Sequence, residues 1–184
     1  GDIHYQGLGV SPDPGIAADW YEKAAGKGEA RAEVALASLL HAGTGRPADP
    51  KRAAELFAAA ADKGEPRALL QAGLLHIRGE HLAHDVIRGE TMLRRAGKQG
   101  LLPAVLALAE FYSRGEGLPP DFREAAAWYE QAAELGDVQS QFLIGRMYAT
   151  GTGVATNVRE AARWFLKAAE GGHPTAAHNV AVFH

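Results

Sequence analysis

The sequence predicts an all-α protein, a right-handed α/α superhelix (solenoid) of antiparallel helix pairs that repeat every 36 residues. Three observations lead to this prediction. Glycine recurs at a step of 36 residues in several series, aspartate or asparagine recurs in phase with them, and aromatic pairs fall in the same register. One such regularly spaced series can arise by chance, but several series with the same spacing and in the same phase indicate a repeat fold.

The glycines mark where helices end. One series closes the second helix of each repeat and comprises Gly28, Gly64, Gly100, Gly136 and Gly172. Another closes the first helix and comprises Gly7, Gly43, Gly79, Gly115 and Gly151. Glycine suits both places because it readily adopts the left-handed conformation that terminates helices. A third glycine follows two residues after the second series in every repeat but the third, where His81 replaces it.

Aspartate or asparagine predicts where each second helix begins. The positions are Asp13, Asp49, Asp85, Asp121 and Asn157, and their side chains can accept hydrogen bonds from free N–H groups of the first turn. Pro14 and Pro50 follow two of these caps, where a missing N–H group costs nothing. Trp20, Trp128 and Trp164 occupy one register position within these helices, and we expect all three to anchor helix packing.

The first helix of each repeat carries its apolar residues on one face. In the fourth unit these are Ala104, Leu108, Ala109 and Tyr112, a spacing that places them on one side of a helix. We expect one solenoid domain over 1–184, with repeats at approximately 1–28 (partial), 29–64, 65–100, 101–136, 137–172 and 173–184 (partial). Because the register starts and stops within first helices, we expect a segment of a longer protein, or ends that something else covers.

Composition excludes several classes of protein. The formal net charge is −3, whereas sequence-independent nucleic-acid binders are usually basic, so no nucleic-acid partner is expected. The absence of cysteine excludes disulfides and thiolate metal sites. No apolar run approaches the ~20 residues that span a membrane, and the start of the chain does not read as a signal peptide. The compartment, periplasmic or cytoplasmic, stays open.

The repeat resembles the Sel-one-like repeat family, a relative of the tetratricopeptide repeat. Residues 104–136 read AVLALAEFYSRGEGLPPDFREAAAWYEQAAELG, and residues 140–172 read SQFLIGRMYATGTGVATNVREAARWFLKAAEGG; both follow the family pattern nearly throughout. The third repeat departs most, with His76, His81, Gly89 and Gly97 at positions of tyrosine, glycine and alanine. The resemblance implies an adaptor or scaffold, most often bacterial, that acts through a protein or peptide partner.

Catalytic signatures are missing from the sequence. It contains no phosphate-binding P-loop, no HExxH, no GxSxG and no SxxK, so we expect no enzyme, no cofactor and no small-molecule substrate. His76, His81 and His84 lie near Glu80 and Asp85, and a metal site is one interpretation of them. The alternative is structural: His76 fills a tyrosine position, while His81 and His84 lie in a solvated loop.

The resemblance also implies a partner-binding surface, because the first helices of such solenoids line the concave face. If the geometry follows tetratricopeptide repeats, the predicted partner-binding residues are Arg31, Val34, His41, Arg67, Leu70, Leu74, Arg78, Leu106, Glu110, Arg114, Phe142 and Arg146. Apolar side chains beside arginines favour a protein segment with apolar anchors and acidic residues. The alternative is that these arginines pair with glutamates on adjacent helices and the apolar residues pack between repeats.

The predicted function is therefore a protein–protein interaction module, an adaptor or scaffold. The runner-up has the same fold and a different setting: a regulatory or assembly subunit of the bacterial envelope, in a secretion, signalling or polysaccharide-export complex. A further hypothesis concerns the third repeat. Gly89 and Gly97 cost ~1 kcal/mol each relative to alanine within a helix, so this repeat is expected to be a softer joint.

Overall fold

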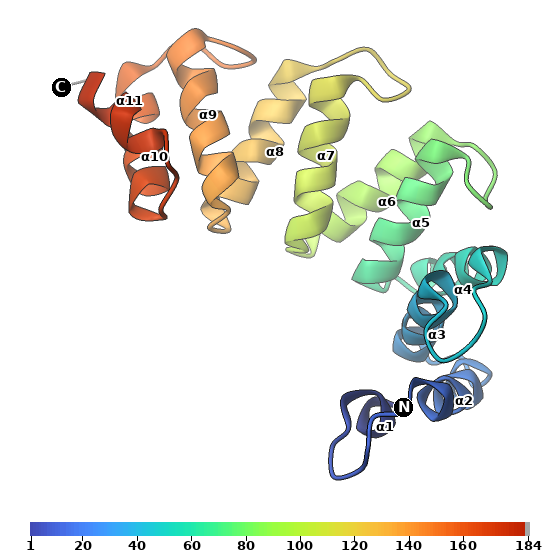
Figure 1. Cartoon of the computed structure of the whole chain (residues 1–184). Helices are drawn as coiled ribbons and strands as arrows, with labels where there is room; N and C mark the ends of the chain where they lie inside the picture. Colours follow the sequence, from blue (N-terminus) through green and yellow to red (C-terminus); the bar gives the residue numbers. More distant parts are fainter. Residues whose placement is uncertain (183–184) are drawn as a thin grey trace. The chain divides into compact units, whose positions relative to one another are not determined.

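The computed structural model describes residues 1–182; the last two residues of the partial repeat expected at 173–184 lie outside the described part. The helices are α1 (Asp2–Gln6), α2 (Pro14–Ala25), α3 (Ala30–Ala42), α4 (Pro50–Asp62), α5 (Pro66–Arg78), α6 (Val86–Lys98), α7 (Leu102–Arg114), α8 (Phe122–Glu134), α9 (Val138–Thr150), α10 (Val158–Glu170) and α11 (Ala176–Val182). No strand occurs within 1–182. The all-α repeat of helix pairs is confirmed (Figure 1).

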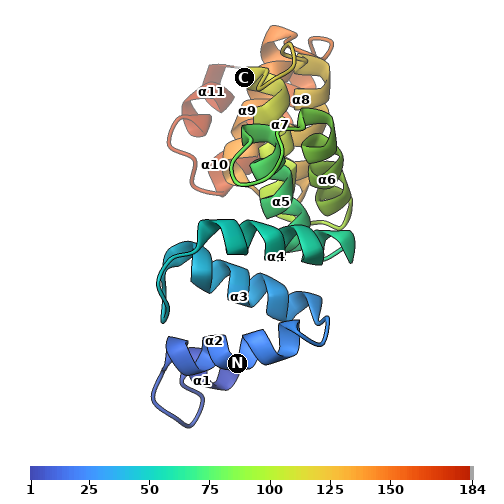
Figure 2. The same ribbon diagram turned by 90° about the vertical axis from the view of Figure 1, so that its right-hand side faces the viewer.

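Odd-numbered helices are the first helices of the repeats, and even-numbered helices are the second. Within α1 to α6, and within α7 to α11, each helix packs against its neighbours in sequence, as Figures 1 and 2 show for α3, α4 and α5. Contacts divide the chain into two compact units, Gly1–Gln99 and Gly100–His184. Each unit is a stack of helix pairs, and the single domain expected over 1–184 stays a prediction.

The predicted caps of the second helices are confirmed. Asp49 accepts a hydrogen bond from the Arg52 N–H at 3.0 Å, and Asn157 accepts one from the Glu160 N–H at 3.2 Å. The predicted glycine ends are confirmed as well, because the glycines that close first helices have φ between 66° and 74°. Local chemistry therefore fixes the amino ends of the second helices and the carboxyl ends of the first helices. The second helices end two or three residues before the glycines predicted to close them, and those glycines have positive φ in the turn that follows.

The expectation for the tryptophans holds for two of the three. Trp164 is 1% exposed and packs with Ala126, Ala133, Ile144 and Met147 of α8 and α9. Trp128 is 7% exposed, whereas Trp20 is 50% exposed, so Trp20 is not an anchor buried between helices. The register gives all three the same position along a second helix, but it does not supply the neighbouring helix that buries the indole.

The loops after the first helices touch the start of the preceding second helix through backbone atoms. A Cβ on Gly45 would lie 2.4 Å from the Pro14 carbonyl carbon, and one on Gly153 would lie 1.9 Å from the Phe122 carbonyl oxygen. Both contacts leave no room for a side chain. In the first of these loops Arg46 also donates hydrogen bonds to Asp19 and, at 2.8 Å, to Glu22 of α2.

The third repeat keeps the fold despite its unusual residues. His76 is buried at its tyrosine position, and its Nδ1 lies 2.8 Å from the Ala83 carbonyl oxygen. His81 has a φ of 59°, so it adopts the left-handed conformation that glycine has in the other repeats. None of the helices within 1–182 has the length and apolar character needed to cross a bilayer.

Candidate groove for a partner segment

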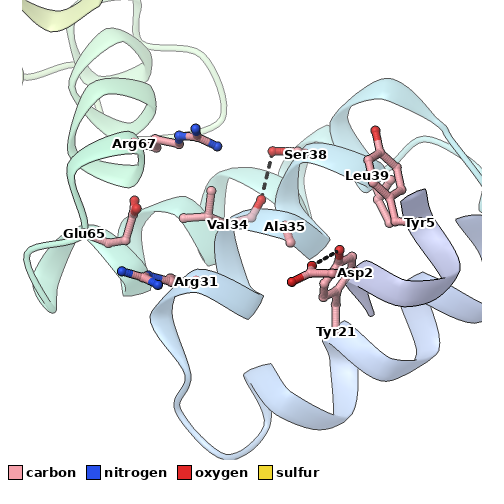
Figure 3. A pocket seen from close by; sticks show the side chains of 10 residues that line it. All are labelled: Asp2, Tyr5, Tyr21, Arg31, Val34, Ala35, Ser38, Leu39, Glu65 and Arg67. Carbon is pink, nitrogen blue, oxygen red and sulfur yellow. Dashed lines mark hydrogen bonds between the residues drawn. The ribbon is translucent and has the colours of Figure 1, made fainter. Parts of the chain in front are cut away.

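A pocket of about 590 Å³ opens along α3 within the first unit (Figure 3). Residues from α1, α2, α3 and the start of α5 line it: Asp2, Tyr5, Tyr21, Arg31, Val34, Ala35, Ser38, Leu39, Glu65 and Arg67. We call this pocket the α3 groove. Three of the predicted partner-binding residues, Arg31, Val34 and Arg67, line it.

The α3 groove has an apolar middle. Val34 and Leu39 are buried in the packing of α3, and Ala35 is half-buried beside them. The Ser38 hydroxyl donates a hydrogen bond to the Val34 carbonyl oxygen at 2.9 Å, so its proton is already used within α3. The middle of the groove therefore offers mainly carbon surface to a ligand.

The two carboxylates of the groove are engaged by groups of the protein. Asp2 Oδ1 accepts a hydrogen bond of 2.6 Å from the Tyr21 hydroxyl, and Glu65 Oε2 accepts one of 2.7 Å from the Ala68 N–H at the start of α5. Burial, followed by the hydrogen bond to Asp2 and its negative charge, raises the pKa of Tyr21. Burial and Asp2 together therefore favour the protonated form of the phenol, and Glu65 serves as a helix cap.

The two arginines of the groove are exposed and uncommitted. Within residues 1–182 neither Arg31 nor Arg67 forms an ion pair or a side-chain hydrogen bond. Figure 3 shows both side chains at the end of the groove near Glu65, while Asp2 and Tyr21 lie at the other end. The guanidinium groups of Arg31 and Arg67 thus offer free hydrogen-bond donors at one end of the α3 groove, and such donors suit an anionic ligand group.

The remaining predicted residues lie elsewhere in several environments. Leu70 is buried, Leu74 and Leu106 are half-buried, and His41 is exposed. Two arginines have partners close in sequence: Arg78 lies 4.0 Å from Glu80, and Arg114 lies 3.4 Å from Glu110 and 3.8 Å from Glu116. These pairs lie within one helix or at its end, not between adjacent helices as the alternative interpretation expected. Arg146 is exposed and has no ion pair within 1–182.

Phe142 of α9, in the second unit, contacts a residue of the following repeat. Its ring stacks on His173 with centroids 4.1 Å apart and planes 13° apart, and it meets Phe165 at 5.7 Å. Phe142 and His173 occupy the register positions of Val34 and Glu65 in the α3 groove. In the second unit two stacked rings therefore stand where the first unit has Val34 and Glu65.

Sequence reasoning missed several groove residues for an identifiable reason. Asp2 and Tyr5 hold the register positions of Ser38 and His41, 36 residues earlier, so the same positional rule applied to the first partial repeat would have found them. Tyr21 and Glu65 lie outside that positional rule, and only the folded arrangement brings them to the groove. Within residues 1–182 no group of three or more histidines and carboxylates is placed to hold a metal ion.

A family model matches most of the chain. The Sel1 repeat model matches residues 1–29, 30–65, 102–137 and 138–173, which leaves unmatched the third repeat with its unusual glycines and histidines. No curated protein sequence matches the chain.

Solved structures match over nearly the whole chain. A Sel1 repeat protein from Oxalobacter formigenes is 29% identical with a TM-score of 0.80, and the match covers 97% of this chain and 71% of that one. A protective antigen of uropathogenic Escherichia coli strains with an SLR fold is 29% identical with a TM-score of 0.90, over 97% of this chain and 38% of that one. A Sel1 repeat protein from Klebsiella pneumoniae is 22% identical with a TM-score of 0.57, over 90% and 83%, which shows a shared fold.

Proposed function

The chain belongs to the Sel1 repeat family, and from that premise we propose that it is a scaffold whose α3 groove binds an acidic, partly apolar segment of a partner protein. Repeats of this family are generally protein–protein interaction modules, and its members are typically non-enzymatic. The proposal adds a location and a ligand chemistry to that general role. It concerns this chain, which spans 38% of the E. coli antigen it matches.

The observation that carries the proposal is the pair of exposed arginines at one end of the groove that have no partner among the described residues. Each carboxylate there already accepts a hydrogen bond from the protein, whereas Arg31 and Arg67 have no partner within residues 1–182. A guanidinium binds a carboxylate through two parallel hydrogen bonds, and such charge-assisted bonds are stronger than neutral ones. A segment with acidic residues can therefore pair with both arginines.

The apolar middle of the groove accounts for the second part of the ligand chemistry. Val34 and Ala35 present carbon atoms between the arginines and the Asp2–Tyr21 pair, so a leucine- or valine-like side chain of a partner can bury its surface there. Each such side chain contributes about 1.5–3 kcal/mol when fully buried. Charged groups at one end and apolar contacts beside them would together select the position of the segment along α3.

The test begins with selection of 12-residue peptides from a random library on the purified chain. We expect enrichment of sequences in which Asp or Glu lies near Leu, Val or Ile. A selected peptide, labelled with fluorescein, is then titrated with the original chain and with the double variant Arg31→Glu/Arg67→Glu, and binding is followed by fluorescence anisotropy. Because both guanidinium contacts become repulsive, the dissociation constant should rise at least about tenfold, and the loss should shrink in high salt.

The matched control is Arg123→Glu/Arg159→Glu, which makes the same change in net charge at exposed residues of α8 and α10. This control should bind the peptide within about twofold of the original chain, because those arginines lie outside the groove. Equal loss of affinity in both variants would show that the change in net charge weakens peptide binding and that contacts in the groove do not. Unchanged affinity in the groove variant would reject the α3 groove as the binding site.

A further inference from the structure

Another pocket of the first unit, of about 320 Å³, lies between α2, α3 and α4. The residues that line it are Glu22, Ala25, Gly26, Glu33, Leu36, Arg52, Glu55, Leu56 and Ala59. We call it the α4 pocket. It and the α3 groove use opposite faces of α3, because Glu33 and Leu36 are about half a helical turn away from Arg31. The two sites are therefore separate.

Carboxylates outnumber cations in the lining of the α4 pocket. Glu22, Glu33 and Glu55 line it together with Arg52, whose Nη1 lies 3.4 Å from Glu55 Oε2. Glu22 binds Arg46, which is not part of the lining, at 2.8 Å. Such a lining favours a cationic ligand. Within residues 1–182 no three carboxylates or histidines are placed around one metal ion, so the pocket suits an organic cation.

Glu33 supplies a buried acceptor that the protein leaves unused. The residue is 6% exposed, and its Oε1 accepts a hydrogen bond of 2.6 Å from Lys63 Nζ. Its Oε2 has no hydrogen-bond partner within residues 1–182. Buried polar atoms nearly always have a partner, because an acceptor that loses its hydration without gaining a donor is costly. An ammonium group carries three N–H donors and a positive charge, so it suits this oxygen.

Two other second helices hold a lysine where the α4 pocket has only the methyl group of Ala59. In the repeat register Ala59 corresponds to Lys23 of α2 and Lys167 of α10. Lys23 Nζ lies 4.6 Å from the centre of the Trp20 ring, and Lys167 Nζ lies 4.5 Å from the centre of the Trp164 ring. Each of these helices therefore places its own ammonium group over an aromatic ring, and α4 has no ammonium group at this position.

The aromatic ring is replaced in α4 as well. Leu56 stands at the register position that tryptophan occupies in α2 and α10, and its side chain is smaller than an indole. Leu56 and Ala59 thus remove an apolar body and a cation from this place, whereas Glu33 adds a carboxylate where the second unit has Gln141. An aliphatic chain that ends in an ammonium group supplies both of the missing components.

We propose that the α4 pocket binds a primary ammonium group carried on an aliphatic chain. The ammonium group pairs with Glu33 Oε2 and with Glu55, and the chain packs against the carbon atoms of Leu36 and Leu56. Free alkylamines and lysine side chains share this chemistry. The site is separate from the α3 groove and does not depend on the proposed function.

The first experiment titrates the nitrogen-labelled chain with n-pentylamine at constant pH and ionic strength, and two-dimensional NMR spectra follow binding. We expect saturable shifts of the amide signals of Glu33, Leu36 and Ala59, with a dissociation constant of about 1 mM. Pentan-1-ol, which has the same chain without the charge, should bind at least about tenfold more weakly. No saturable shift with n-pentylamine, or equal affinity for pentan-1-ol, overturns the proposal.

The decisive variant is Ala59→Lys, which gives α4 the lysine of α10 and fills the pocket with an ammonium group of the chain itself. It should abolish binding of n-pentylamine. Ala58→Lys is the matched control, because it adds the same charge to α4 outside the lining, and its dissociation constant should stay within about twofold. Undiminished binding by Ala59→Lys, or equal losses in both variants, contradicts the assignment of the pocket.

A second variant tests the buried acceptor directly. Glu33→Gln keeps the shape of the side chain and removes its charge, so the dissociation constant should rise at least about tenfold. Urea unfolding shows that each variant folds, and unchanged affinity in folded Glu33→Gln would reject Glu33 as the partner of the ammonium group. Nα-acetyl-lysine methylamide separates the two sources of the ligand: tighter binding than n-pentylamine assigns the pocket to a lysine of a partner protein, and weaker binding assigns it to a free amine.

Discussion

Gly89 of α6 lies against Gly73 of α5 so closely that a Cβ on Gly89 would be 2.5 Å from the Gly73 carbonyl oxygen. A Cβ on Gly73 would be 2.9 Å from the Gly89 carbonyl oxygen, so the two helix backbones approach each other at this point. The hypothesis of a soft joint considered only the helix propensity of glycine. The contact supplies a different reason for Gly89, which is close packing of α5 and α6.

The substitution Gly89→Ala should therefore lower the free energy of unfolding. Alanine favours a helix by ~1 kcal/mol over glycine, but forcing its methyl group into backbone atoms costs about 1–3 kcal/mol. Urea unfolding followed by circular dichroism measures the balance. Gly26→Ala is the matched control, since its Cβ would meet its nearest neighbour at an ordinary 3.4 Å. A Gly89→Ala variant as stable as the Gly26→Ala variant would contradict the close-packing explanation and would support the hypothesis that the third repeat is a softer joint.

His81→Gly should raise the free energy of unfolding by about 1 kcal/mol, because a residue other than glycine is strained in the left-handed conformation. His81 has a φ of 59°, and the corresponding glycines of the four other repeats have φ between 74° and 79°. Thermal unfolding measures the gain. His84→Gly, three residues later and without positive φ, should lose stability. A loss in both variants would show that the His81 side chain contributes more than its backbone strain costs.

The ion pair between Lys63 and Glu33 should be sensitive to removal of either partner alone. Lys63 Nζ lies 2.6 Å from Glu33 Oε1, and the Glu33 side chain is 8% exposed. Lys63→Met leaves a buried carboxylate without its cation, which should lower the free energy of unfolding by about 2 kcal/mol, allowing for the partial exposure of Lys63.

The companion change is Glu33→Leu, since Leu69 occupies the same register position and is fully buried. In the Lys63→Met background it should recover most of the loss, because no charge then remains buried. Urea unfolding of both single variants and the double variant gives the coupling energy. Additive losses in the double variant would show that the pair contributes little beyond its separate side chains.

Alkaline pH should destabilise the fold partly through Tyr21. Burial and Asp2 raise the pKa of Tyr21 above its ordinary value, so the folded chain keeps a proton that the unfolded chain loses near pH 10. This contribution to stability is complete below about pH 10 and is lost as pH rises toward the folded pKa. Urea midpoints between about pH 8 and pH 11 should fall less steeply in Tyr21→Phe. An unchanged slope would show that other groups dominate.

The sequence predicted helix ends more reliably than contacts between helices. The caps at Asp49 and Asn157 depend on three or four consecutive residues, so the 36-residue register locates them. Burial of Trp20 depends on a neighbouring helix, and the register alone does not say whether one lies there.

The groove was predictable only in part for the same reason. Register and family geometry selected Arg31 and Arg67, which are exposed in the groove. They also selected Phe142, which stacks on His173 of the following repeat. Where two side chains of neighbouring repeats touch, their sizes differ from one repeat to the next. The solvent exposure of such a residue therefore depends on both side chains of the contact, and the residue type at one position does not predict it.

The glycines of the loops have a consequence for how such chains diverge. Gly45 and Gly153 contact the first residues of the preceding second helices through main-chain atoms. These backbone contacts therefore help to set the distance between neighbouring repeats. Exchange of a repeat for one from a relative should preserve that spacing if the cut lies in the same register and these glycines are kept. The exposed side chains of α3 can then be replaced to suit another ligand, which makes the repeat a convenient module for recombination and for design.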